Sequence, residues 1–347
     1  MARKIEGPIN TPTPLRSHPA IAAIIIVGGL IALIFALALS VAVGAVHIKL
    51  TIVWQALFNF DPNITKHNII WELRIPRAIA GALVGASFAV AGAIMQGMTR
   101  NAMADSGLLG LNAGAGFALA LCFALFPGGS YLSLMLFSLL GAAVGAGLVF
   151  GISSMNKGGL SSARLILAGA AVTALLIALS EGVALYYHVG QDLAFWYAGG
   201  MAGIEWTQIA MIAPWIIGAL IGAMLLSRSI TLLSLGDDVA IGLGIRTRWV
   251  KLVCMLVVLI LAGASVSIVG SVGFVGLIIP HAARYLVGVD YRYIIPCSAV
   301  LGSLLIVVAD IGARMINPPY ETPVGALIAL IGVPFFLYLA RREGRQL

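Results

Sequence analysis

Long apolar runs separated by short polar stretches make up most of this chain. Runs long enough to cross a bilayer fall near residues 20–46, 76–98, 107–126, 131–152, 163–185, 207–227, 249–272, 296–313 and 323–340. Spanning a hydrocarbon core as a helix takes about 20 such residues. A shorter run near 274–289 contains Pro280, which predicts a short or kinked helix. The pattern therefore predicts an all-α polytopic membrane protein with about ten transmembrane helices.

Composition supports a membrane protein over a soluble one. Hydrophobic residues are 61% of the 347 and charged residues only 10%, and the mean hydropathy is +1.06. Soluble domains carry about 25% charged residues. The first apolar run exceeds the roughly 7–15 residues of a signal-peptide core, so we expect a retained helix. We predict a tail at 1–19 and a single membrane domain at 20–347.

The distribution of basic residues predicts which side the termini occupy. An even number of helices puts both termini on one side. If that side is the cytoplasm, the outer segments hold only Lys49, Lys66, Arg74, Arg77 and Arg314, and the other 15 of the 20 Lys and Arg residues lie inside. This bias follows the positive-inside rule. It predicts cytoplasmic termini, and it explains the net charge of +7 without a nucleic-acid partner.

The remaining reactive side chains predict no metal site. Cys122, Cys254 and Cys297 lie far apart within apolar runs, and the five histidines are scattered. His281 follows Pro280, where we expect a hydrogen-bonded structural residue. Glu181 is the one acid in the run at 163–185; we expect it near the outer boundary, and the alternative is a cavity-facing acid.

A faint internal repeat links the two halves of the chain. The stretch GASFAVAG at 85–92 matches GASVSIVG at 263–270, five predicted helices later. An odd number of helices per half would invert one half relative to the other, as in many transporters. Because glycine and alanine are abundant here, a chance match remains the alternative.

The stretch LSLGDDVAIGLGIRTRW at 233–249 is a polar interruption on the predicted cytoplasmic side. Asp237 to Leu243 could form two helical turns, with Gly236 before them and Gly244 as a stop. The two acids would lie in the first turn, where the helix dipole favours negative charge. So short a helix is unstable alone. It is either a solvated loop or a docking element for a cytoplasmic partner.

The chain resembles the FecCD-type permeases, the transmembrane subunits of ABC importers for iron-siderophore, haem and cobalamin. The resemblance extends from about residue 20 to residue 341. It rests on LRIPRAIAGALVGASFAVAGAIMQ (73–96), GLLGLNAGAG (107–116), LSSARLILAG (160–169), LGDDVAIGLGI (235–245), GFVGLIIPHAAR (273–284), ADIGAR (309–314) and ETPVGALIALIGVPFF (321–336). It implies the BtuC-like fold of type II ABC importers.

The resemblance implies a role for the segment at 233–249 and for three outer arginines. The ATPase-coupling residues would be Leu235, Gly236, Asp237, Asp238, Ala240, Leu243 and Gly244. Arg74, Arg77 and Arg314 would dock a substrate-binding protein. For Arg74 and Arg77 the alternative is interfacial anchoring. For Arg314 it is an internal partner, because Asp310 stands four residues earlier, at helical ion-pair spacing.

The resemblance also implies a gate and a pathway. Ser161, Ser162 and Ala163 would form the cytoplasmic gate, although Ser161 or Ser162 would equally suit a helix cap. The pathway-lining residues would be Thr173, Leu176, Ser180, Leu327 and Ile331, with Val333 beside them. Ala102 and Ser106 replace prolines that the family usually has in NAMADSGLLG (101–110), which predicts a looser turn.

The resemblance implies an assembly as well. A second permease chain, identical or similar, would complete the pathway in the cytoplasmic membrane of a bacterium. Two ATP-binding cassette ATPases would use ATP and Mg²⁺, and an extracytoplasmic binding protein or lipoprotein would deliver the cargo. We expect no cofactor on this chain and no enzymatic activity, since it lacks a GxxxxGK[ST] phosphate loop. The expected cargo is a ferric siderophore; haem and cobalamin are alternatives, and an ion-coupled secondary transporter is the competing class.

Overall fold

A computed structural model describes residues 17–44, 48–155, 162–318, 320 and 322–343. All its regular elements over these residues are helical. They are α1 (Pro19–Ala42), α2 (Leu50–Phe58), α3 (Thr65–Asn68), the π-helix η1 (Ile69–Arg74), α4 (Ile75–Thr99), the 3₁₀ helix η2 (Ser106–Leu109), α5 (Leu111–Leu125), α6 (Tyr131–Ser154), α7 (Ser162–Tyr186), α8 (Gly190–Ala198), α9 (Trp206–Ser234), α10 (Asp237–Gly242), α11 (Thr247–Val269), α12 (Val275–Val287), α13 (Tyr291–Ile316) and α14 (Val324–Glu343).

The ten predicted membrane helices are confirmed. Seven helices are long and apolar enough to span a bilayer, and α5, α12 and α14 are shorter apolar helices. Five short helices were not predicted as separate elements: α2 and α3 before α4, the π-helix η1, the 3₁₀ helix η2 before α5, and α8 before α9. The run containing Pro280 is a helix of 13 residues, as expected for a short element.

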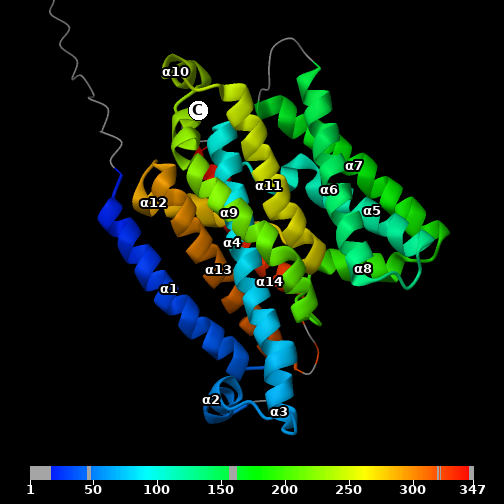
Figure 1. Ribbon diagram of the computed structural model, residues 1–347. Coiled ribbons are helices and arrows are strands. Elements are labelled where there is room, and N and C mark those ends of the chain that lie inside the picture. The colour runs from blue at the N-terminus through cyan, green and yellow to red at the C-terminus, as the bar shows by residue number, and fades with distance from the viewer. Residues whose placement is uncertain (1–16, 45–47, 156–161, 319, 321, 344–347) are drawn as a thin grey trace, which may run out of the picture.

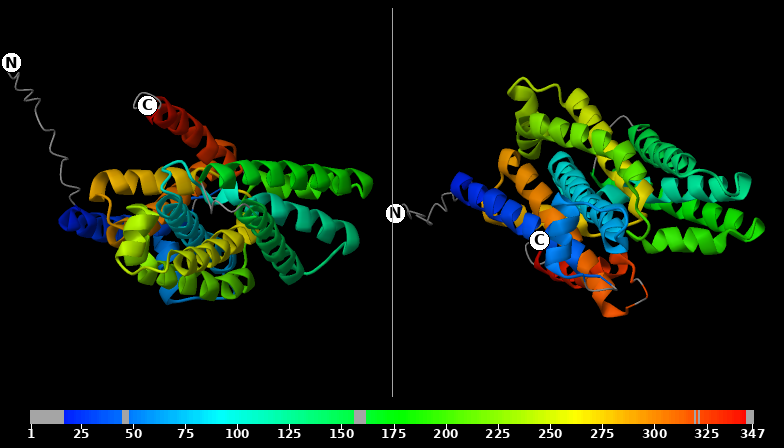
Figure 2. Two further views of the ribbon diagram at one scale, coloured as in Figure 1. Left: turned by 90° about the horizontal axis from the view of Figure 1, so that it is seen from above. Right: turned by 60° about the horizontal axis from the view of Figure 1, so that its bottom comes forward.

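The helices surround α4, which has α1, α13, α12, α9 and α11 as neighbours. Helices α5, α6, α7 and α8 form a second group beside them (Figure 1). One end of the bundle carries α10, and the opposite end carries α2 and α3 (Figure 1). We call these the α10 end and the α2 end. Helix α1 begins and α14 finishes towards the α10 end, as an even number of spans requires (Figures 1 and 2).

The two halves of the chain share a structural feature that supports the internal repeat. Helices α4 and α11, which contain the matching stretches, pack together and run in opposite directions (Figure 1). The next apolar helix in each half is short, with 15 residues in α5 and 13 in α12. Each starts after a residue in the left-handed region, Gly110 at φ +70° and Phe274 at φ +67°. Short helices in matching positions are typical of inverted transporter repeats.

The two loops before these short helices meet inside the bundle. The Nδ2 of Asn112 donates to the Oγ of Ser271 at 3.1 Å, and the carboxylate of Asp105 lies against Gly276. Burial raises the pKa of Asp105, although the backbone N–H groups of Ser106 and Gly107 hydrogen-bond its carboxylate and oppose this shift. The loop at 101–110 is therefore held by its acidic side chain rather than by prolines.

Glycine permits the closest helix contacts. A Cβ on Gly92 of α4 would overlap the carbonyl of Gly276 in α12, and one on Gly85 would overlap that of Gly302 in α13. Gly114 of α5 and Gly141 of α6 meet in the same way. Apolar surface drives no association between helices in lipid, so close backbone packing is a main source of stability.

We expect Gly92→Ala to destabilise the protein by about 3 kcal/mol or more, because the new methyl group must displace the backbone of α12 rather than a side chain. Thermal unfolding in detergent would measure the loss. Gly147→Ala is the matched control, since Gly147 is also helical but has nothing within 4 Å of its Cβ position. Equal melting temperatures for the two variants would contradict this account of the packing.

Candidate functional site

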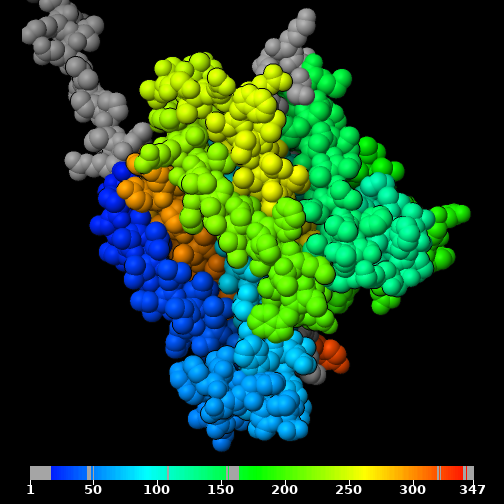
Figure 3. Space-filling view, viewed as in Figure 1, coloured from blue at the N-terminus to red at the C-terminus, as the bar shows by residue number. Residues whose placement is uncertain are grey.

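The segment predicted to couple to a partner forms a separate short helix that projects from the bundle. Helix α9 ends at Ser234, Gly236 turns the chain at φ +125°, and α10 covers Asp237–Gly242. Gly244, at φ +84°, closes the turn by donating its N–H to the carbonyl of Ile241. The sequence prediction of a short helix between two glycines is confirmed. Figure 3 shows the segment protruding at the α10 end.

Helix α10 turns apolar side chains away from the protein. Val239, Ile241 and Leu243 are 47%, 58% and 61% exposed, and Leu235 before them is exposed too. Ala240 alone is fully buried against the bundle. An exposed apolar group on a membrane protein's polar loop is typical of an interaction surface. The segment therefore presents a small apolar face rather than a solvated polar loop.

An ion pair joins α10 to the neighbouring helix α11. The Nζ of Lys251 in α11 donates to Oδ2 of Asp237 at 2.6 Å, and both groups are partly buried. Asp238 and Arg246 are exposed. The two adjacent acids therefore differ: Asp237 holds α10 to α11, and Asp238 contributes negative charge to the surface.

A series of hydrogen bonds joins the end of α9, just before α10, to the centre of the bundle. The Oγ1 of Thr231, near the end of α9, donates to Asp290 at 3.2 Å and accepts from the backbone N–H of Tyr291 at 2.9 Å. Burial acts to raise the pKa of Asp290, but hydrogen bonds and charge from Arg292 outweigh it and hold the pKa below its usual value.

The series continues from Tyr291 into α4. The Nη2 of Arg284 donates to the hydroxyl of Tyr291 at 2.7 Å and to Oε1 of Gln96 at 3.3 Å. The Nε2 of Gln96 donates in turn to the carbonyls of Gly276 and Leu277 at the start of α12. The ends of α9, α12 and α13 are thereby joined to α4 at the α10 end.

The three predicted docking arginines lie close together at the α2 end, and two of them share one aspartate. Arg77 of α4 contacts both carboxylate oxygens of Asp310 in α13, with Nη2 at 2.8 Å from Oδ1. The Nη2 of Arg314 lies 3.1 Å from Oδ2 of Asp310. The internal partner expected four residues before Arg314 is therefore present, beside a second arginine that sequence spacing did not predict as its partner.

Arg314 and Arg74 also cap the end of α1. The Nη1 of Arg314 donates to the carbonyls of Ser40 and Val43, and the Nη1 of Arg74 donates to those of Val41 and Ala42. The last carbonyls of a helix have no intrahelical partner, and cations are favoured there. Arg74, Arg77 and Arg314 are each only 8% exposed. Their contacts within the protein are shown, and docking stays a prediction.

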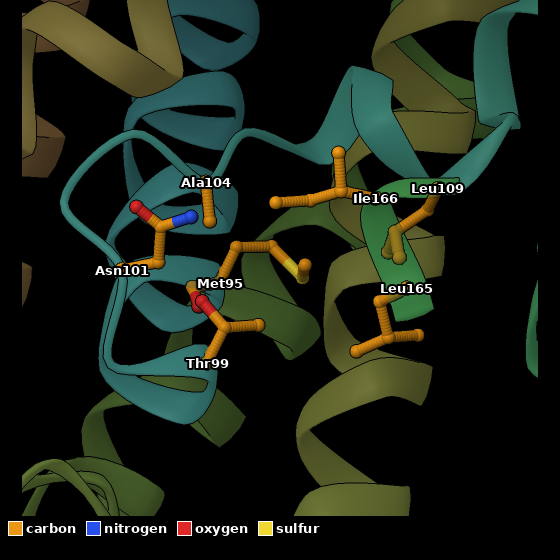
Figure 4. Close-up of a pocket in the computed structure, with 7 residues that line it drawn as sticks. All are labelled: Met95, Thr99, Asn101, Ala104, Leu109, Leu165 and Ile166. Carbon is orange, nitrogen blue, oxygen red and sulfur yellow. The ribbon is translucent and has the colours of Figure 1, made fainter. Parts of the chain in front are cut away.

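The predicted cytoplasmic gate lies at the start of α7. Ser161 is outside the described residues; Ser162 and Ala163 open α7. The next turn of α7 contributes Leu165 and Ile166 to a cavity of about 10 Å³ with Met95, Thr99, Asn101, Ala104 and Leu109 (Figure 4). That volume is near the minimum for one water molecule. Residues of α7, of the end of α4 and of the loop that follows it therefore meet around this small space.

The predicted pathway residues do not share one environment. Leu176 and Ser180 of α7 are buried within the protein, with the Ser180 hydroxyl donating to the carbonyl of Leu176, and Thr173 is half-buried. On α14, Leu327 is half-buried while Ile331 and Val333 are exposed. The exposed face of α7 presents other residues, Leu167, Leu175 and Leu179.

Two further residues singled out in the sequence lie elsewhere. Glu181 lies near the α2 end of α7 and is exposed. His281, in α12, packs edge-on to Phe335.

Sequence analysis missed a large cavity at the α2 end. It measures about 460 Å³ and lies between α8, the end of α11 and the start of α14. Gln191, Asp192 and Arg77 supply its polar lining, with Phe195 and Trp196 among its aromatic residues. Small-molecule sites commonly have this size and mixture of groups. The signal in the sequence was the aromatic-rich stretch GQDLAFWYAGG at 190–200, too short to stand out beside the spanning runs.

Comparison with known proteins agrees with this architecture. The model of the FecCD transport family matches residues 30–342. The chain is 53% identical to the iron(3+)-hydroxamate import system permease protein FhuB of Bacillus subtilis (strain 168), over 94% of this chain and 85% of the relative. It is 36% identical to the hemin transport system permease protein HmuU of Yersinia pestis, over 93% and 97% of the two chains.

A solved structure shares the fold. It is described as an inward-facing conformation of a putative metal-chelate type ABC transporter, and matches with a TM-score of 0.81 at 27% identity, covering 94% of this chain and all of that one. The helical arrangement, the family model and the relatives agree over nearly the whole chain. This protein therefore belongs to the FecCD transport family, as an all-helical transmembrane permease of the ABC importer type.

Proposed function

We propose that this chain is one of two permease subunits of an ATP-driven importer that carries a ferric siderophore across the cytoplasmic membrane. The α10 end would face the cytoplasm, where two separate ATPase subunits use ATP and Mg²⁺. The α2 end would face outward, towards a binding protein or lipoprotein that delivers the cargo. The chain itself would hold no cofactor.

One observation carries this proposal: α10 presents an apolar face on a rigid attachment. Val239, Ile241 and Leu243 point away from the bundle, while the Asp237–Lys251 pair holds α10 to α11. Thr231 joins the end of α9, just before this segment, to the start of α13. A surface that transmits force needs both features. The cavity of about 460 Å³ at the opposite end supplies a place where cargo could enter.

The relatives favour a ferric siderophore as cargo. The 53% identical relative is an iron(3+)-hydroxamate permease, and others at 41% and 40% identity belong to an iron-uptake system and a ferric enterobactin system. Haem is the second candidate, because the hemin permease also matches over nearly its full length. A ferric hydroxamate is therefore the first cargo to test.

The function is tested by uptake of radioactive iron into cells with and without this chain. We expect loss of ATP-dependent uptake of ferric hydroxamates and unchanged uptake of labelled haem and cobalamin. Depletion of ATP at constant ion gradient separates the importer from an ion-coupled carrier. Uptake that survives ATP depletion and collapses with the gradient would contradict the proposal.

The coupling role makes a prediction about charge at the start of α10. Reversing both acids in Asp237→Lys with Asp238→Lys should lower transport and substrate-stimulated ATPase activity several-fold while the protein still inserts. The reason is that the ATPase subunit would meet positive charge where the unaltered protein presents negative charge. Transport assays and ATPase activity of the purified complex measure the two effects.

A charge swap separates docking from simple loss of the internal ion pair. Adding Lys251→Glu to the double variant restores an opposite-charge pair between α10 and α11 but leaves the surface reversed. If coupling involves the partner surface, activity stays low in this triple variant. Recovery to the level of the unaltered protein would assign the effect to local structure alone.

For the arginine cluster we propose two roles, internal support and contact with the binding protein. Support rests on the contacts to Asp310 and to the end of α1. Contact with the binding protein rests on the resemblance and on Arg77 lining the cavity at the α2 end. Arg74 and Arg314 would then act indirectly. They would hold the ends of α1 and α13 in the positions that form the docking surface for the binding protein.

Arg77→Ala should therefore lower both stability and docking. Removing one partner of a buried ion pair costs about 3–5 kcal/mol, moderated here because Arg314 still contacts Asp310. Thermal unfolding measures the first effect, and affinity for the binding protein at a temperature where both variants are folded measures the second. Lys66→Ala, an exposed change at the same end, is the control. Unaltered affinity for folded Arg77→Ala would remove the docking role.

A further inference from the structure

Helix α2 is largely apolar, although it lies in a connection between two spanning helices. Val53 and Ala56 pack into a small core with Val41 and Ile70. On the opposite face Trp54 and Phe58 are 66% and 67% exposed, and their rings lie 4.5 Å apart. Between Lys49 and Asp61 the sequence contains no charged residue. Exposed Thr51 and Gln55 lie on the same outward face as Trp54 and Phe58. This face thus mixes large apolar and small polar side chains, as expected of a helix that lies at a membrane interface.

Two hydrogen bonds fix the height of α2 along the bundle. The indole N–H of Trp206, at the first residue of the spanning helix α9, donates to the carbonyl of Trp71 at 2.7 Å. The indole N–H of Trp71 donates to the carbonyl of Ala56 at 2.6 Å. Helix α2 therefore lies level with the end of α9. Because α9 has 29 residues, it is about 44 Å long, so its ends reach into the headgroup regions that flank a hydrocarbon core of about 30 Å.

The surface of α2 is continuous with one that faces lipid. Helix α1 buries little of itself against the protein, and Ile24, Ile31 and Phe35 are among its exposed residues. Helix α2 follows directly beyond the end of α1 on the same side of the molecule (Figure 3). Exposed Leu57, Phe60, Ile64 and Leu73 extend the apolar area around α2.

Aromatic residues also concentrate at this level. The ring of Trp71 lies 6.1 Å from that of Phe60 and 6.3 Å from that of Trp206. Tryptophan gathers at membrane–water interfaces because its ring is apolar while its N–H needs a polar partner. Exposed Lys49, just before α2, can place its ammonium among lipid phosphates while its stem stays in apolar surroundings.

We propose that α2 is an interfacial helix that inserts Trp54, Leu57 and Phe58 into the lipid headgroup–acyl boundary at the α2 end. It would brace the ends of α1 and η1 against the membrane surface, next to the arginine cluster. The inference requires only that the chain spans a bilayer. It depends neither on the cargo nor on which side of the membrane the α2 end faces.

Spin-label accessibility in liposomes tests this placement on the full-length chain with its partner subunits. Single cysteines replace Trp54 and Phe58 in a background in which the buried residues Cys122, Cys254 and Cys297 are alanine. Collisions of the label with oxygen report lipid, and collisions with a water-soluble nickel complex report water. Both reagents reach both leaflets, so orientation in the liposome does not affect the result.

Two control positions bracket the expected depth. Asn63→Cys, in the exposed turn after α2, should report water, and Ile31→Cys, on the exposed face of α1, should report deep lipid. We expect labels at positions 54 and 58 to have oxygen-to-nickel ratios between these two, clearly shifted towards Ile31. Ratios equal to that of Asn63 would overturn the proposal.

Adding the binding protein separates lipid from a protein partner. If α2 faces lipid, the ratios at positions 54 and 58 stay the same when the binding protein docks. Ratios that report water alone and become protected only on docking would assign this face to the binding protein and overturn the interfacial placement. In either case ATP-dependent uptake by the unlabelled protein is unaffected, so the proposed function is tested independently.

Discussion

In hydrocarbon, a polar group that lacks a partner costs several kcal/mol, and both ends of this bundle are organised by that cost. At the α2 end, Asp310 holds Arg77 and Arg314, and the remaining donors of Arg314 and Arg74 meet the carbonyls that end α1. Three helices are joined by groups that none of them could bury alone. The cluster therefore fixes the relative positions of α1, α4 and α13 at the surface where cargo would arrive.

The α10 end satisfies its polar groups with a network that combines charged and uncharged side chains. Gln96 satisfies the first carbonyls of α12, Arg284 bridges Gln96 to Tyr291, and Thr231 links α9 to the start of α13. The contacts converge on α4, whose glycines let α12 and α13 approach to backbone contact. The contacts at the two ends of the bundle thus share one central helix, α4.

Two short helices, α5 and α12, start inside the bundle in corresponding places of the two halves. Their entry loops meet through Asn112, Ser271 and Asp105. Irregular backbone within a membrane protein is tolerated where protein surrounds it. In this chain it occurs where the entry loops of the two halves contact each other.

The sequence by itself determined the spanning helices, the family and the position of the short helix α10. These depend on local properties: apolar length, glycine at a turn, and acids in the first turn of a helix. It also brought Asp310 to Arg314, because four residues make one helical turn. The pairing of Arg77 with the same carboxylate, 233 residues away, could be decided only by the packing of α4 on α13. For the same reason only the tertiary structure decided that Leu176 and Ser180 face inward, that α8 borders a large cavity, and that α2 lies level with the membrane ends of its neighbours.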